Sequence, residues 1–221
     1  MNESSVMTLR LDPASPMLTV ESVTDGVIAR KNIKKEVLYD CIKSSIAHDP
    51  VQSALLPRGC IAFGEAGNER EVVILYQERY ADINYYGTCY EHFPLPRLVF
   101  AFHCTLNGKV TRRRLGVIQD EQPRPDSVMY YYPFSNVGSS DICTGSNPIP
   151  NYKEVRQLGS LPHYILSLPD NDDFFQAERN ALNLNHRDLL EHLKDKDPAY
   201  YYGHILVPNG HTLQDFIDRR Y

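Results

Sequence analysis

Apolar and polar residues alternate near the start of the chain, and a helical period follows. Residues 7–11 and 17–20 alternate between apolar and polar side chains around turn-forming residues, which predicts two short strands. Over residues 33–46 the apolar side chains recur at steps of three and four, and Asn32, directly before them, is a candidate N-cap. The pattern therefore predicts two strands followed by an amphipathic helix.

The middle of the chain has the pattern of an antiparallel β-meander. Residues 59–64, 72–76 and 98–106 are short runs rich in apolar, β-branched and aromatic side chains. Asn107-Gly108, a dipeptide typical of two-residue hairpin turns, separates the third run from a fourth predicted strand over residues 109–118. We expect each of these strands to pair with its neighbour in sequence.

A long irregular segment and a helical region follow the meander. Proline, glycine, serine and asparagine dominate residues 123–150, and irregular segments of this length in compact domains are often functional. Helical patterns then cover residues 174–184 and 185–193, with Asn185 as the N-cap of the second. Thr212 is placed to cap a final helix that ends at Ile217. Strands grouped together, with helices beside and after them, predict an α+β fold.

Composition and charge narrow the class of protein. With 221 residues, of which 42 % are hydrophobic, the chain has enough apolar side chains to build a core without disulfides or a structural metal. A net charge of −5 argues against nucleic acid as the main partner. The sequence has no apolar run long enough to span a membrane and no signal-peptide pattern at its start. We therefore expect a cytoplasmic protein that binds neither nucleic acid nor a membrane.

Five cysteines, odd in number and without a CxxC pair, are typical of free thiols in a reducing compartment. Cys41 lies on the apolar stripe of the predicted helix, Cys60 and Cys104 lie in predicted strands, and Cys89 lies among aromatic residues. In such places a free cysteine usually acts as a small buried apolar residue. Cys143 stands apart, in the polar and glycine-rich part of the long segment. It is either an accessible nucleophile or a surface cysteine without a role, and composition does not decide between these.

The surroundings of Cys143 resemble a known protein family. Residues 133–137 (PFSNV) are followed by a glycine, an aliphatic residue and the cysteine. This layout is similar to the ubiquitin-conjugating enzymes, in which a His-Pro-Asn turn precedes a short extended segment that ends in the catalytic cysteine. Residues 136–145 most resemble prokaryotic ubiquitin-conjugating family D, the group that includes PRTRC system protein B. Three further stretches extend the resemblance over most of the chain from about Val27 onward, at residues 59–64, 94–102 and 206–213.

The resemblance implies a fold and an activity. It implies a ubiquitin-conjugating-enzyme-like domain over residues 31–221, with an N-terminal helix, an antiparallel meander, a long active-site loop and C-terminal helices. Residues 1–30 are then an N-terminal strand extension. Cys143 would carry a ubiquitin-like modifier as a thioester and pass it to an acceptor protein in a bacterial conjugation pathway. The implied partners are an activating enzyme, the modifier and the acceptor, and no metal or cofactor is expected.

Two departures from the family pattern lie close to the cysteine. Phe134-Ser135-Asn136 stands where the family has His-Pro-Asn, and Asn136 precedes Cys143 by seven residues rather than the usual eight. Asn136 is the candidate oxyanion donor, and the alternative is a turn residue bonded to its own backbone. Asp141 shares a face with Cys143 on an extended segment, and an acidic loop covers residues 170–173. Either could orient an attacking amine, or both are solvent-exposed turn acids.

Two other functions stay open. The missing His-Pro suits an inactive variant that binds a ubiquitin-like protein or scaffolds an assembly. A cysteine hydrolase would instead need a histidine within hydrogen-bond reach of Cys143, and His163, His92 and His103 are the candidates. His186 and His192 are six residues apart and do not share a helix face, so no metal site is expected there.

Overall fold

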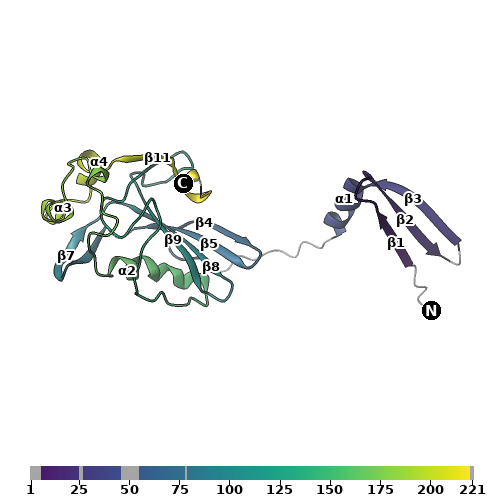
Figure 1. The fold of residues 1–221 in the computed structure, drawn as a ribbon, viewed down its shortest axis with the longest axis horizontal. Helices are drawn as coiled ribbons and strands as arrows, with labels where there is room; N and C mark the ends of the chain where they lie inside the picture. The colour runs from purple at the N-terminus through teal and green to yellow at the C-terminus, as the bar shows by residue number, and fades with distance from the viewer. Residues whose placement is uncertain (1–5, 25–26, 46–54, 78, 220–221) are drawn as a thin grey trace. The chain divides into compact units, whose positions relative to one another are not determined.

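A computed structural model describes most of the chain, over residues 6–24, 27–45, 55–77 and 79–219 (Figure 1). The chain divides into two compact units, Met1–Gln52 and Ser53–Tyr221. The predicted boundary between residues 30 and 31 instead lies inside a strand of the first unit. The helix after that strand belongs to the first unit as well, so this unit is longer than the predicted strand extension.

The first unit is a three-stranded antiparallel sheet followed by a helix. Its elements, in the sheet order β1-β2-β3, are β1 (Val6–Leu11), β2 (Met17–Thr24), β3 (Val27–Lys34) and then α1 (Lys35–Ser45). The sequence analysis did not predict β3, and it placed Asn32 at a helix N-cap. In the structure Ile33 pairs with Leu18, and the Thr19 hydroxyl donates to Asn32 Oδ1 at 2.8 Å. Cross-strand pairing thus takes the first two residues of the predicted helix, and α1 confirms the prediction from Lys35 to Ser45.

Little apolar surface is buried within the described part of the first unit. Leu18, at 2 % exposure, is its one buried hydrophobic side chain among the described residues. Val37 and Ile42 on α1 are about half exposed, at 46 % and 49 %. Cys41 is exposed beside them, so the expectation that it belongs to a core was wrong.

The second unit is built on a six-stranded antiparallel sheet with the order β11-β10-β9-β8-β5-β4. Figure 1 shows β4, β5, β8 and β9 beside one another, and these are the four strands of the predicted meander. The strands of the sheet are β4 (Cys60–Ala66), β5 (Glu69–Tyr76), β8 (Leu98–Thr105), β9 (Val110–Ile118), β10 (Val128–Tyr130) and β11 (Pro208–Thr212). The α+β class predicted from the sequence is therefore confirmed.

A separate hairpin interrupts the meander between β5 and β8. It consists of β6 (Tyr80–Tyr85) and β7 (Thr88–Pro94), which form a two-stranded sheet of their own. The sequence analysis did not predict this hairpin. Cys89 lies in β7 on its exposed side, so the expectation that it is a core residue was wrong, whereas Cys104 in β8 is buried as predicted.

The two faces of the six-stranded sheet bury different residues. On one face Phe100, Phe102 and Leu115 pack with residues of the helices that follow β10. These helices are η1 (Val155–Ser160, 3-10), α2 (Leu161–Leu166), η2 (Ala177–Arg179, 3-10), α3 (His186–Leu193) and α4 (Tyr200–His204). The other face packs against the last helix, α5 (Leu213–Ile217), through Phe216. No helix in the described ranges has the length and apolar character needed to cross a membrane.

The helix predictions near the C-terminus have mixed outcomes. Asn185 caps α3 and Thr212 caps α5, each by accepting a hydrogen bond from the backbone N–H three residues on, as predicted. The helix predicted over residues 174–184 was wrong. Phe174 has a left-handed φ of 62°, and the Asn180 side chain bonds the backbone of Ala177 and Leu184. These side-chain bonds to the backbone compete with the helical ladder.

The turn between β8 and β9 depends on a glycine. Gly108 has a φ of +85°, and a Cβ placed on it would lie 2.0 Å from the carbonyl oxygen of Tyr152. The Tyr152 backbone N–H donates to the Gly108 carbonyl at 2.8 Å, so the turn is fastened to the segment that leads into η1. Gly87, in the β6–β7 turn, has a similar φ of +81°, but no atom of the described residues lies within 4 Å of the position that a Cβ would take there.

We expect Gly108→Ala to destabilise the second unit more than Gly87→Ala. Both changes force an L-residue into the left-handed region, at a cost of about 1–2 kcal/mol. Only Gly108→Ala adds a clash with backbone, which typically costs about 1–3 kcal/mol more. Urea unfolding followed by near-ultraviolet circular dichroism measures the difference. Equal losses in the two variants would show that the contact with Tyr152 yields freely.

Candidate functional site

The outer edge of β9 is shared by two different segments. β10 pairs with the end of β9, where Met129 is opposite Ile118. Nearer the start of β9 the edge bonds the long segment instead, because the Leu115 N–H donates to the Ser140 carbonyl at 2.9 Å and the Ile142 N–H donates to the Arg113 carbonyl at 3.0 Å. The segment that leads to the candidate cysteine is thereby held in register with the sheet.

Asn136 and Cys143 close a small hairpin at this edge. The Cys143 N–H donates to the Asn136 carbonyl at 2.8 Å, and Val137 forms an isolated antiparallel bridge with Ile142. Asn136 adopts a left-handed φ of 60°, which asparagine tolerates better than most residues. The seven-residue spacing therefore leaves the two candidate residues directly opposite each other in this hairpin.

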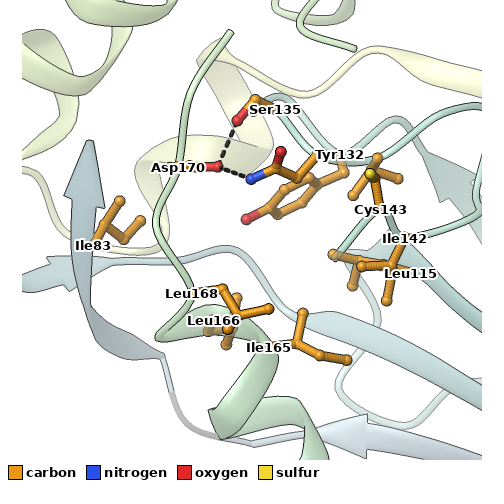
Figure 2. A pocket seen from close by; sticks show the side chains of 12 residues that line it. Ile83, Leu115, Tyr132, Ser135, Ile142, Cys143, Ile165, Leu166, Leu168 and Asp170 are labelled. Carbon is orange, nitrogen blue, oxygen red and sulfur yellow. Dashed lines mark hydrogen bonds between the residues drawn. The ribbon is translucent and has the colours of Figure 1, made fainter. Parts of the chain in front are cut away.

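The side chain of Asn136 is directed at an acid from another segment. Its amide nitrogen donates to Asp170 Oδ1 at 2.6 Å and lies 3.4 Å from the Pro169 carbonyl oxygen. The Ser135 hydroxyl donates to the same carboxylate oxygen at 2.5 Å, and Figure 2 shows both bonds. The Asn136 backbone N–H also donates to the Asp173 carbonyl at 2.8 Å. Asn136 thus links the cysteine hairpin to the acidic loop through both its side chain and its backbone.

The β6–β7 hairpin holds Asp170 by hydrogen bonds to the main chain of Asp170. The Asp170 N–H donates to the Asn84 carbonyl at 2.7 Å, and the Asp170 carbonyl accepts from the Tyr86 N–H at 3.2 Å. These bonds form a short parallel bridge beside Tyr85. The unpredicted hairpin thus positions one of the acids that the sequence analysis singled out.

A small cavity separates Cys143 from Asp170 (Figure 2). Its volume is about 40 Å³, which is room for a few water molecules and too little for a bulky side chain. Its walls are mostly apolar and also carry the polar side chains of Ser135, Asn136 and Asp170, together with the Tyr132 ring and the Cys143 thiol. The lining residues are Ile83, Leu115, Tyr132, Ser135, Asn136, Val137, Ile142, Cys143, Ile165, Leu166, Leu168 and Asp170.

Cys143 also borders a wider depression of about 230 Å³ at the surface. Small and polar residues line much of it, including Gly145, Ser146 and Asn147. Cys143 itself is partly exposed, which is the accessibility that the sequence analysis expected of a nucleophile.

Burial governs the ionisation of Asp170. Desolvation raises the pKa of Asp170 to about 6, while the hydrogen bonds from Ser135 and Asn136 act in the opposite direction. Asp172 adds a like charge that also raises this pKa. The acid is therefore placed to exchange a proton near neutral pH, a property typical of functional carboxyls as well as of structural ones.

Asp141 has a different environment. Arg112 donates two hydrogen bonds to its carboxylate, at 2.8 Å and 3.1 Å, and this pairing lowers the pKa of Asp141. The side chain is 56 % exposed. Its position is therefore explained by a surface ion pair at the start of β9, and it is not among the residues lining the cavity next to Cys143.

The histidine candidates lie apart from the thiol. His163 is exposed on α2, His92 stacks on Tyr80 with ring centroids 4.1 Å apart, and His103 bonds Glu71 at 2.7 Å. Among the described residues no hydrogen bond joins Cys143 to a histidine. The geometry gives no support to a cysteine hydrolase.

The sequence analysis missed three polar residues of the site. Ser135 bonds Asp170, the Tyr132 ring lines the cavity, and the side chain of His186 lies 3.9 Å from Asp170. Ser135 and Tyr132 belong to the same irregular segment as Cys143, and their nearness to the cysteine in sequence could have marked them as candidate site residues. No signal in sequence connects His186, at the start of α3, to a loop fifteen residues before it.

The raised pKa of Asp170 predicts a pH effect on stability. Because the folded-state pKa of about 6 lies above the ordinary value, the folded protein binds the extra proton, and this stabilisation is lost as pH rises through about 6. A shift of this size corresponds to at most about 3 kcal/mol. Asp170→Asn keeps an acceptor for Ser135 and never ionises. We expect its urea midpoint to fall less than that of the wild type between about pH 4 and pH 7.

The matched control for that measurement is Asp173→Asn, which changes an exposed acid of the same loop. It should follow the wild-type curve. A wild-type midpoint that changes with pH just as that of Asp170→Asn does would contradict the assignment of the raised pKa to Asp170.

Comparison with known proteins finds no family model, no curated protein and no solved structure that matches this chain. The resemblance around Cys143 therefore rests on the motifs in the sequence alone. The chain is an α+β protein whose best-defined candidate site joins Cys143, Asn136 and Asp170.

Proposed function

We propose that the protein is a ubiquitin-conjugating-enzyme-like carrier, in which Cys143 holds a ubiquitin-like modifier as a thioester. The observation that supports this most directly is the hairpin that sets Asn136 opposite Cys143 at the edge of β9. The partners in this proposal are an activating enzyme that loads Cys143, the modifier itself and an acceptor protein. The pathway would be a bacterial conjugation system.

The order of elements supports the same proposal. Four antiparallel strands, β4, β5, β8 and β9, precede the cysteine hairpin, and η1 and α2 follow it. The resemblance implies this sequence of meander, active-site loop and helices. The β6–β7 hairpin and the first unit are additions to that plan, and α1 belongs to the first unit.

The chemistry of loading needs access more than special activation. A modifier C-terminus moves from one thiol to another by thioester exchange, in which attacking and leaving groups are comparable. Cysteine is intrinsically nucleophilic even when only a few per cent is thiolate near neutral pH. The partial exposure of Cys143 and the surface depression beside it meet this requirement.

Transfer to an amine needs an oxyanion donor, and Asn136 is the candidate. One N–H of its amide is committed to Asp170, and the other points toward the Pro169 carbonyl at a longer 3.4 Å. A hydrogen bond of that length is weak. In this proposal a thioester oxygen replaces the Pro169 carbonyl as the acceptor of this N–H, while the amide keeps its bond to Asp170. A well-placed donor of this kind is worth about 3 kcal/mol in the transition state.

Of the two acids predicted near the cysteine, Asp170 is the better supported. It shares the cavity with Cys143, whereas Asp141 is paired with Arg112 at the surface. In this proposal Asp170 orients and deprotonates the incoming amine. Asp141 remains the alternative acid, and replacing each of the two acids in turn distinguishes which of them assists the transfer.

A second function has one observation in its favour. The Asn136 amide already bonds Asp170, and Phe134 is fully buried in an aromatic cluster where the family has histidine. Both suit an inactive variant that binds a ubiquitin-like protein without forming a thioester. The experiment below distinguishes the two.

We expect a reducible adduct when the protein is incubated with ATP and with the activating enzyme and ubiquitin-like protein of the same genome. Cys143→Ser should trap a hydroxylamine-sensitive oxyester, and Cys89→Ser, a change at another exposed thiol, should leave the adduct intact. Asn136→Ala should load normally and slow discharge to free lysine about 100-fold. Electrophoresis with and without reductant measures all three.

Asp141→Asn is the matched comparison for Asp170→Asn in the discharge step. If only the change at Asp170 slows discharge, Asp170 is the functional acid. Binding of the ubiquitin-like protein without any adduct in the wild type would favour the inactive variant and reject the carrier.

A further inference from the structure

His186 is a buried histidine whose two ring nitrogens meet different surroundings. It begins α3 directly after the Asn185 N-cap, and its side chain is 1 % exposed. Nδ1 lies 3.0 Å from the Asn171 carbonyl oxygen and 3.2 Å from Asp172 Oδ1. Nε2 has no hydrogen-bond partner among the described residues and lies 3.9 Å from Asp170 Oδ2.

These contacts define the tautomer of the ring. A backbone carbonyl such as that of Asn171 accepts hydrogen bonds and cannot donate them, so Nδ1 must carry the ring proton. Burial lowers the pKa of His186, with Asp172 acting in the opposite direction, and the neutral imidazole is favoured. In that form Nε2 presents a lone pair. The lone pair faces the carboxylate of Asp170, so two acceptors lie opposite each other with no proton between them.

One proton satisfies both groups. Oδ1 of Asp170 already accepts from Ser135 and Asn136, which leaves Oδ2 as the oxygen that faces His186. A proton on Oδ2 can be donated to Nε2 once the 3.9 Å separation shortens by about 1 Å to hydrogen-bond length. The pair is therefore poised to take up a single proton and share it.

We propose that Asp170 and His186 form a proton-accepting pair that takes up the proton released when an amine attacks an acyl group on Cys143. The inference rests on the proposed function and deepens it. His186 does not touch the reacting atoms and acts as a positioning residue, because its lone pair makes Asp170 a better base. The 40 Å³ cavity between Cys143 and Asp170 has room for the few water molecules that would relay the proton.

The transfer step balances with these groups alone. The amine nitrogen bonds to the thioester carbon, and the carbon–sulfur bond breaks with its electron pair going to Cys143 Sγ. The proton leaves the nitrogen and reaches Asp170 Oδ2, where it is shared with His186 Nε2. It then passes to the Cys143 thiolate, and the pair returns to its starting state.

Two tyrosines near the pair, Tyr85 and Tyr132, keep their protons near neutral pH. Asp172 accepts from the Tyr85 hydroxyl at 2.9 Å and from His186 Nδ1. Burial raises the pKa of Tyr85 to about 12, and burial also raises the pKa of Tyr132 well above its usual range. Arg187 lies over the Tyr85 ring at 5.2 Å. Asp170, whose raised pKa of about 6 lies near neutral pH, is thus the group that changes charge, and the neutral His186 faces it.

The test uses the full chain with the two exposed thiols, Cys41 and Cys89, changed to serine. Cys143 is acylated with N-acetylglycine thiophenyl ester, and discharge to free lysine is followed by intact mass across acidic to mildly alkaline pH. We expect Asp170→Asn to slow discharge about 100-fold, the usual loss for a missing general base.

His186→Phe keeps a ring stacked on Phe175 and removes the lone pair. We expect it to slow discharge about tenfold and to move the acidic limb of the pH profile to lower pH, because Asp170 becomes a weaker base. His163→Gln, a change at an exposed histidine of α2, should alter neither rate nor profile. A purely structural role for His186 would lower the rate without moving the profile.

A second measurement is independent of thioester chemistry. Nitrogen-15 NMR of the His186 ring, with the carbon-13 shift of the Asp170 carboxyl, should show the Nδ1–H tautomer and one protonation step common to both residues. An Nε2–H tautomer, or an unmoved pH profile in a folded His186→Phe, overturns the pair. If the pair titrates as described and no activating enzyme charges Cys143, the proposed function fails and the pair stands.

Discussion

The site depends on how the outer edge of β9 is divided. An antiparallel edge offers a row of N–H and carbonyl groups that must be bonded. β10 takes one end of that row, and the segment from Ser140 to Ile142 takes the other. This second pairing places Cys143 one residue beyond the sheet, where its thiol is partly exposed while Ile142 beside it is buried. Anything that displaced the segment from β9 would move the thiol relative to every other group of the site.

Polar groups then connect this edge to the rest of the unit. Asp170 accepts from Ser135 and Asn136 on the cysteine side and faces His186 on the other. Each of these side chains comes from a segment with its own packing, since Phe134 beside Ser135 is fully buried and His186 opens α3. A buried polar cluster of this kind is costly unless its members satisfy one another, which limits the arrangements that the loops can adopt.

The sequence predicted the parts of the fold that follow local rules. The Asn107-Gly108 turn, the apolar strands around it and the caps at Asn185 and Thr212 depend on neighbouring residues, and the structure has all of them. It failed where distant pairing decides. Residues 27–34 form β3 because β2 lies beside them, and Asn180 forms an antiparallel bridge with Leu206 within the stretch predicted as a helix. The contact between His186 and Asp170 likewise exists only in three dimensions.

The β6–β7 hairpin gives the acid of the site an unusual kind of support. Both main-chain groups of Asp170 are bonded to it, through Asn84 and Tyr86, in addition to the bonds that the side chain receives. The conformational entropy of ordering this residue is therefore lost when the unit folds rather than each time a substrate arrives. In the proposed transfer, an acid oriented in advance would need little reorganisation as charge develops. The β6–β7 hairpin, although remote from Cys143 in sequence, would supply that orientation.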